Sequence, residues 1–348
     1  MSDLVPVDDF YTPANLETIN FRLGLIKNYP RYIQSKPQRN HTFDEKHTFQ
    51  LTKRSNFTGN GAIAKIVEYE DNQILFSTHR GDVSGYNLDT DEYSTIYNHN
   101  NTRVSALSYI KDAGLIVSGA QDGTLSLMKS GKLTQSEIHK DRIVDICSLN
   151  HSLNNVLSIS HDKTWSLLDL NDYEAPLYKQ DGYTSPLTAM SLSCFDHLFI
   201  TATIDEIQMH DLRSGVLVGR SKNVDKEPCH DMKILNNNHT LIAGGQGKLK
   251  IFDLRRLNID GINDCLIDEK LVHQGNLVTS MDLKDDVLVS TGFKDASVEI
   301  NTLRNGIIEN INDNKKDMVI AGDKLLTSKI MDDGQILTAG FNSKINFI

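Results

Sequence analysis

The chain has 348 residues, with 36 Lys and Arg against 46 Asp and Glu, and a formal net charge of −10 at pH 7. This negative field disfavours direct nucleic-acid binding, because such binding depends on cationic side chains that displace counterions from phosphates. A hydrophobic fraction of 39% and a charged fraction of 24% are those of a folded globular protein, and they exclude a largely disordered or fibrous one.

No stretch approaches the length of a membrane-spanning helix, and the first residues have neither a basic nor an apolar targeting segment. We therefore expect an intracellular protein, nuclear or cytoplasmic, that is not secreted and does not contact a membrane. The four cysteines are scattered without a Cys-x-x-Cys pair, which predicts buried thiols; no metal and no cofactor are expected. They are Cys147, Cys194, Cys229 and Cys265.

Residues 1–46 form an N-terminal arm that does not fit the pattern of the rest. Residues 16–29 place Leu16, Ile19, Leu23 and Ile26 at helical spacing, and Pro30 ends the run. An amphipathic helix outside a domain packs either on that domain or in a partner's groove, and both interpretations are open.

Residues 47–348 repeat one template of an apolar run, a small or hydroxyl residue, a tight polar turn and an alternating run. Equivalent positions near the end of each unit are separated by 42, 40, 42, 42, 49 and 47 residues. They are Tyr86, Met128, Leu168, His210, Phe252, Asn301 and Ile348. This spacing is typical of a four-stranded propeller blade, and the alternation predicts an all-β domain.

The seven units also have an upstream alternating strand, and the last unit stops at Ile348, in its third strand. A strand must then come from elsewhere to complete that unit. Residues 47–53, with the sequence HTFQLTK, alternate correctly and precede the first unit. We predict that they pair with the C-terminal strand and close the ring, which removes the exposed sheet edges.

The third unit carries the residues that point to a known family. His139, Ser160, Asp162 and Thr164 are followed by Leu168-Asp169, in a pattern that resembles the Gly-His, Ser-x-Asp-x-Thr and Trp-Asp elements of WD repeats. The resemblance implies a seven-bladed WD-repeat β-propeller over residues 47–348. The chain departs from the family because no unit has Trp at the final position, and the one tryptophan is Trp165.

The resemblance implies roles for several residues. Asp122, Asp162 and Asp295 are expected to fix structural turns within blades, and His99 and His139 to be buried structural histidines. Partners of such propellers dock where the turns and the starts of the inner strands meet, here called the top face. The residues expected there are His79, Arg103, Gln121, Arg142, His161, Lys294 and Phe341. Cations and an aromatic on an acidic protein favour an acidic peptide or helix; the alternative is a solvated loop rim.

Two adjacent units end with Asp-x-Arg, at residues 211–213 and 253–255. Tandem endings of this kind resemble substrate receptors of cullin-RING ubiquitin ligases, in which the arginines bind the adaptor on the opposite face. Arg213 and Arg255 would have that role here, although Asp-Leu-Arg is also an ordinary repeat ending.

Motifs for phosphate-binding loops, serine hydrolases, zinc proteases and EF-hands are absent from the sequence. We therefore expect a non-catalytic protein. The leading hypothesis is an interaction scaffold or adaptor subunit of an intracellular multiprotein complex, with several protein partners. A ligase substrate receptor is the alternative, followed by a propeller enzyme with its site in the central channel.

Overall fold

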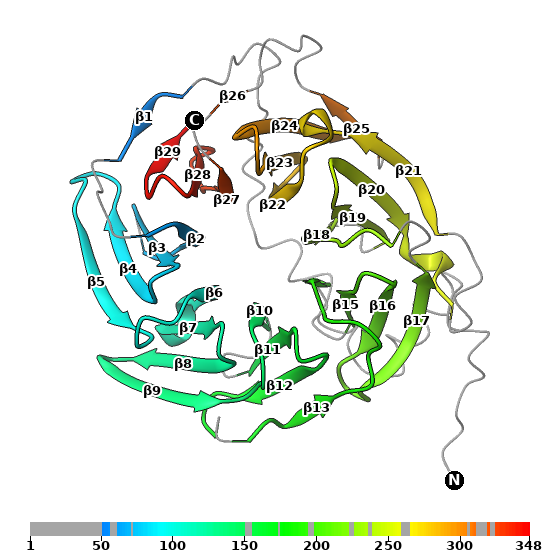
Figure 1. Cartoon of the computed structure of the whole chain (residues 1–348), viewed down its shortest axis with the longest axis horizontal. Helices are drawn as coiled ribbons and strands as arrows, with labels where there is room; N and C mark the ends of the chain where they lie inside the picture. The colour runs from blue at the N-terminus through cyan, green and yellow to red at the C-terminus, as the bar shows by residue number, and fades with distance from the viewer. Residues whose placement is uncertain are drawn as a thin grey trace, which may run out of the picture.

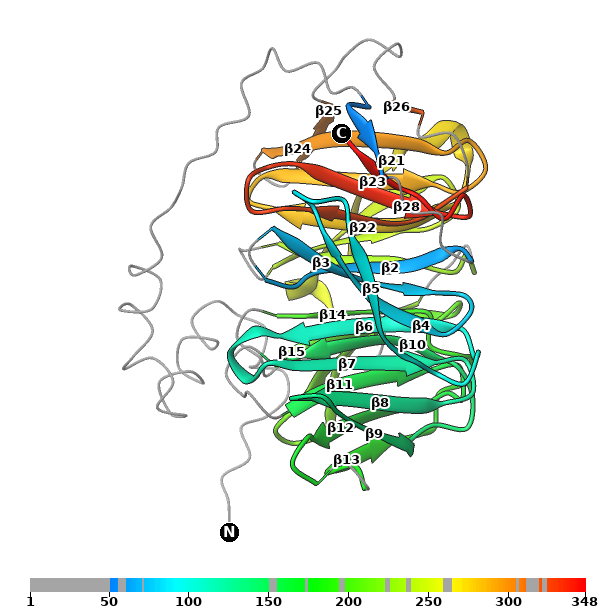
Figure 2. The same ribbon diagram turned by 90° about the vertical axis from the view of Figure 1, so that its left-hand side faces the viewer.

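The computed structural model describes residues 51–55, 61–70, 72–149, 155–172, 175–193, 198–222, 226–235, 239–258, 265–304, 307–310, 319–320 and 324–348. Within these ranges the strands form seven antiparallel sheets arranged around a centre, as Figure 1 shows. The chain is a seven-bladed β-propeller, which confirms the predicted fold. Figure 2 shows the same blades from the side.

Blades 1 to 4 follow the chain from the inner strand to the outer one. Blade 1 consists of β2 (Ile63–Glu68), β3 (Gln73–Thr78), β4 (Asp82–Asn87) and β5 (Tyr93–Asn98). Blade 2 consists of β6 (Val104–Ile110), β7 (Leu115–Ala120), β8 (Thr124–Lys129) and β9 (Lys132–Glu137). Blade 3 consists of β10 (Ile143–Ser148), β11 (Asn155–Ser160), β12 (Trp165–Asp169) and β13 (Tyr178–Gln180). Blade 4 consists of β14 (Ala189–Leu192), β15 (Leu198–Ala202), β16 (Glu206–Asp211) and β17 (Val216–Lys222).

Blades 5 to 7 complete the ring. Blade 5 consists of β18 (Asp231–Ile234), β19 (Thr240–Gly244), β20 (Lys248–Asp253) and β21 (Leu266–Leu271). Blade 6 consists of β22 (Val278–Lys284), β23 (Val287–Gly292), β24 (Ser297–Arg304) and β25 (Ile307–Asn310), and β26 (Val319–Ile320) also pairs with β24. Blade 7 consists of β27 (Leu325–Ile330), β28 (Ile336–Gly340), β29 (Ile345–Phe347) and β1 (Lys53–Arg54). Short 3-10 helices span Lys111–Ala113 (η3), Leu254–Arg256 (η4) and His273–Gly275 (η5).

The apolar core lies between the blades. Each of the seven hydrophobic clusters in the described part of the chain contains side chains of two neighbouring sheets. Between blades 3 and 4, the fully buried Trp165 ring meets Phe199 edge to face, with 4.6 Å between ring centroids. Alternating side chains of each sheet therefore bury both of its faces, which explains why the apolar runs recur with the period of the blades.

The N-terminal strand closes the ring beside the C-terminus (Figure 1). The amides of Thr52 and Ser55 donate to the carbonyls of Phe347 and Ile345, both at 2.9 Å. The Ile345 amide in turn donates to the Ser55 hydroxyl at 3.0 Å. The predicted closure is confirmed, but the paired stretch lies later than the expected residues 47–53, of which 47–50 are outside the described residues.

The helix expected at residues 16–29 lies outside the described residues, and the boundary of the arm at residue 46 stays a prediction. Within the described ranges, none of the helices has the length and hydropathy needed to cross a lipid bilayer.

Deleting residues 344–348 should abolish the cooperative thermal unfolding transition measured by circular dichroism. The deletion removes β29 and leaves β1 without a partner, so blades 7 and 1 lose their connection. Removal of residues 1–55, which deletes β1, should have the same effect, whereas removal of residues 1–46 should leave the transition unchanged. An undiminished transition after loss of residues 344–348 would show that closure does not hold the ring together.

Candidate functional site

A buried histidine organises the turn of blade 3. His139 Nδ1 hydrogen-bonds with Asp162 at 3.2 Å and with Thr164 at 2.9 Å, and its Nε2 hydrogen-bonds with Ser158 at 2.8 Å. Burial opposes ionisation of Asp162, but hydrogen bonds from His139, Thr164 and the Lys140 amide outweigh it and hold the pKa of this carboxyl well below its usual value. Every polar atom of the His139 ring is therefore used inside the blade.

Related arrangements recur in other blades. His99 bonds Ser118 at 2.7 Å and Ser126 at 3.2 Å. His273 has the same environment in blade 6, between Ser290 and Ser297. Asp122 and Asp295 each accept the amide of the residue two positions later, in the turns of blades 2 and 6. These groups stabilise turns by local side-chain to backbone bonds.

The turns and the starts of the inner strands meet at one face of the ring. One backbone hydrogen bond recurs there: the amide of a turn residue donates to the carbonyl of the residue that directly precedes an inner strand. The donors are the amides of His79, Gln121, His161, Phe293 and Phe341, and the acceptors, in the same order, are the carbonyls of Ala62, Arg103, Arg142, Leu277 and Lys324. This repeated hydrogen bond defines the top face, and the residues that it joins occupy equivalent positions in five blades.

An aromatic patch covers the top of blades 6, 7 and 1. The Phe341 ring meets His79 and Phe293 edge to face, with centroids 5.5 Å and 5.9 Å apart. The Lys324 ammonium lies 5.6 Å from the Phe293 ring and 5.7 Å from the Phe341 ring. Phe341 is 44% exposed, so the patch offers apolar area beside a cation. We call His79, Phe293, Phe341 and Lys324 the aromatic patch.

The predicted cations of blades 2 and 3 lie at the top of the central channel. Arg103, Arg142 and His161 line a cavity of about 350 Å³, together with His230 of blade 5. We call these four residues the channel mouth. Burial and the neighbouring Arg142 charge lower the pKa of Arg103 to about 10, and burial with both guanidinium charges lowers the pKa of His79 to about 4. At neutral pH the arginines are charged and His79 is neutral.

Below the channel mouth, charged side chains of the inner strands pair with one another. Lys65 lies 3.4 Å from Asp145, Lys233 3.2 Å from Asp231, and Lys329 3.0 Å from Asp282. A second cavity of about 310 Å³, lined by Lys65, Lys233 and Lys329 among others, lies at the other ends of the inner strands. Carboxylates therefore line the channel, as a propeller enzyme would require, but those named here are bound to lysines.

The structure brings most of the predicted top-face residues into two groups, and it adds three that the sequence analysis missed. Gln121 and Lys294 are exposed and belong to neither group. Blade 6 has one extra residue in its turn, so Phe293 takes the place expected for Lys294. His230 precedes β18 as Arg142 precedes β10, and this alignment could have identified it from the sequence.

On the opposite face, both predicted arginines are held by their own turns. Arg213 Nε and Nη2 donate to Asp211 at 3.0 and 2.5 Å. Arg255 makes the same two bonds with Asp253, at 2.9 and 2.8 Å. Each exposed guanidinium therefore uses its bidentate edge within the blade.

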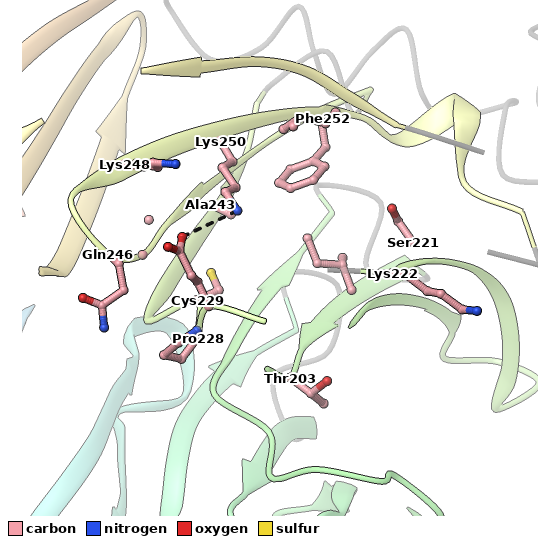
Figure 3. A pocket seen from close by; sticks show the side chains of 15 residues that line it. Thr203, Ser221, Lys222, Pro228, Cys229, Ala243, Gln246, Lys248, Lys250 and Phe252 are labelled. Atoms are coloured by element: carbon pink, nitrogen blue, oxygen red, sulfur yellow. Dashed lines mark ion pairs between the residues drawn. The ribbon is translucent and has the colours of Figure 1, made fainter. Parts of the chain in front are cut away.

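A separate hollow of about 210 Å³ lies between blades 4 and 5 (Figure 3). Its lining includes Ile207, Cys229 and Phe252, and Lys250 pairs with Glu227 across it at 3.7 Å. Burial, with the nearby Asp231 charge, raises the pKa of the Cys229 thiol far above its usual value, which disfavours the reactive thiolate form. Within the described ranges, no group of three or more His, Cys, Asp or Glu side chains is placed to hold a metal ion.

Comparison with known proteins agrees with the fold and the repeat. The sequence model of "WD domain, G-beta repeat" matches residues 91–127, which run from the outer strand of blade 1 into β8 of blade 2. A solved structure, "Crystal structure of WD40 beta propeller domain of Doa1", superposes with a TM-score of 0.71 at 14% identity, over 86% of this chain and 95% of that chain. A search of curated protein sequences finds no significant match. The chain is therefore a seven-bladed β-propeller in which one repeat matches the WD-domain model.

The matched repeat is the second, whereas the third looked closest to the family pattern from its polar residues. The turn of the second repeat has Gly123 at a φ of 84°, where a Cβ would come within 2.0 Å of the His139 carbonyl oxygen. The third repeat has Lys163 in the corresponding left-handed conformation, with a φ of 68°. Glycine adopts this conformation without strain, which fits the better match of the second turn.

Replacing Asp162 by Asn should lower the free energy of unfolding at pH 7 by about 2 kcal/mol, because it removes the carboxylate charge that accepts hydrogen bonds from His139, Thr164 and the Lys140 amide. A carboxyl with a depressed folded pKa stabilises the fold above about pH 4 and loses that contribution as the pH falls through the folded pKa. The difference between the two proteins should therefore shrink at acidic pH, measured by urea unfolding. The control, Asp122→Asn, alters an exposed turn and should change stability by less than about 0.5 kcal/mol. An equal loss in both variants would refute this role of Asp162.

Proposed function

We propose that the protein is a non-catalytic interaction scaffold or adaptor subunit of a multiprotein complex, and that it binds an acidic segment of a partner on its top face. WD-repeat propellers generally bind other proteins, which supports the general role. The aromatic patch is the single observation that supports this face as the docking surface. Its Phe341 ring is exposed although Phe293, His79 and Lys324 contact it.

The chemistry of the patch favours one class of partner. Exposed aromatics anchored among better-buried neighbours provide most of the binding energy in many interfaces. Lys324, with Arg103 and Arg142 of the channel mouth, adds positive charge on a protein whose net charge is −10. A peptide or helix with acidic residues around an apolar side chain would therefore be oriented by charge and held by the phenylalanines.

The opposite face supports the ligase-receptor alternative less well. Arg213 and Arg255 hold Asp211 and Asp253 with the paired donors that would bind an adaptor carboxylate. An adaptor would have to use the remaining donors or displace these pairs. The same two arginines provide a matched control for the top face.

The double variant Phe293→Ala with Phe341→Ala should lose the partners that co-purify with the wild-type protein, measured by affinity purification and quantitative mass spectrometry. Removal of two anchoring rings should weaken binding by at least about 2 kcal/mol, or roughly thirty-fold. The amount of partner retained on the wild-type protein should also fall as the salt concentration of the wash rises, because the proposed partner is acidic.

The control is Arg213→Ala with Arg255→Ala, which should keep the same partners. If that variant loses them and the phenylalanine variant does not, the partner binds the opposite face and a ligase adaptor becomes the better assignment. Melting temperatures of both variants, measured beforehand, separate lost binding from lost folding.

A further inference from the structure

The cavity at the channel mouth is built from the whole ring. Its lining takes residues from all seven blades, and its volume of about 350 Å³ lies in the range of small-molecule sites. Because the ring is closed, the inner strands that carry these side chains are held in place relative to one another.

The charges of this cavity are unevenly matched. Its two carboxylates are already bound, since Asp145 pairs with Lys65, and Asp231 pairs with Lys233 and accepts the Met281 amide at 2.7 Å. Arg103 and Arg142 line the same cavity, and in the described part of the chain the Nε atom of each is buried without a hydrogen-bond partner. The exposed Asp141 carboxylate, outside the cavity lining, favours the charged form of Arg142. Inside the cavity, both guanidinium groups are left without a carboxylate partner.

The Arg142 charge disfavours the charged form of Arg103. Burial and this charge lower the pKa of Arg103 to about 10, so Arg103 stays charged at neutral pH beside Arg142. Burial, followed by the Arg142 charge, lowers the pKa of His161, which keeps this imidazole mostly neutral at pH 7. A bound anion would relieve the repulsion and accept hydrogen bonds from all of these groups.

We propose that the channel mouth is a binding site for a small, doubly charged oxyanion of phosphoryl type, held by Arg103 and Arg142 with His161 and His230 beside it. Such a site goes beyond partner docking, because it lies inside the ring and needs no protein ligand. The phosphoryl group can belong to a free phosphate compound or to a phosphorylated side chain.

Charge and geometry select this class of ligand. One carboxylate would neutralise one of the two arginines and leave the other in excess. A phosphoryl dianion carries close to two charges at neutral pH and three acceptor oxygens, which suit two guanidinium forks. The cavity also has room for a diphosphate.

Pyrophosphate at micromolar to low millimolar concentration should bind the purified wild-type protein, measured by isothermal titration calorimetry, and should raise its melting temperature. Chloride at matched ionic strength should do neither. The variant Arg103→Gln with Arg142→Gln should bind at least about ten-fold more weakly for each guanidinium removed. Arg213→Gln, whose side chain lies on the opposite face, should bind as the wild type does.

Absence of pyrophosphate binding to the wild-type protein would overturn the site, as would equal binding by the double variant. The double glutamine variant removes two repelling charges, so it should fold, and its melting temperature checks this. An independent readout is the imidazole resonances of His161 and His230, which should shift on titration while those of the buried His139 stay constant; shifts of His139 alone would also overturn the site.

A second arm distinguishes the two sources of the phosphoryl group. A short phosphoserine peptide is titrated beside pyrophosphate, with the unphosphorylated peptide as control. Stronger binding of the phosphopeptide supports a modified partner as the source, and stronger binding of pyrophosphate supports a free compound. The assay uses purified protein only, so loss of partners in the phenylalanine variant and loss of anion binding in the arginine variant are separate results.

Discussion

The pairing of β1 with β29 is the constraint on which the rest of the structure depends, because it makes the last blade from both ends of the described chain. Lys53 of β1 extends the junction to blade 1 through its ion pair with Asp91 at 2.8 Å. A ring closed in this way cannot open without breaking a sheet. The top face and the channel mouth are therefore rigid surfaces, although most of their residues lie in turns.

At the centre of the ring, hydrogen bonds link the inner strands of neighbouring blades and so reinforce the closure. The Ile66, Met281 and Ile330 amides each donate to a side chain of the preceding blade: Thr327, Asp231 and Asp282. The Asp231 and Asp282 carboxylates thus join neighbouring blades, which gives a structural reason for acids in the channel. In the described part of the chain, the Nε atoms of Arg103 and Arg142 make no such bond between blades. The carboxylates therefore stabilise the ring, whereas these two guanidinium groups remain for a ligand.

The recurrence of the template was sufficient to predict seven blades and the closing strand, because both depend on spacing that repeats along the chain. The buried histidines, His99 and His139, were predicted from the resemblance to WD repeats. Phe293 was missed because blade 6 has one additional turn residue, and counting back from Asp295 therefore selects Lys294. Arg103, Arg142 and His230 come together because their blades border the same cavity. Sequence order alone does not show how close residues of different blades lie across the channel. The ion pair between Asp211 and Arg213 likewise depends on side-chain geometry that the sequence does not specify.

The overall charge and the local charge of the top face act at different distances. At physiological salt the field of a net charge of −10 is screened beyond about 8 Å, so an acidic partner meets little repulsion until it is near the surface. There the arginines and Lys324 determine the local potential, while burial strengthens the interaction of the arginines with an anion. A net negative charge is therefore compatible with the anionic ligands proposed for the top face and the channel mouth, because the local cations act at short range.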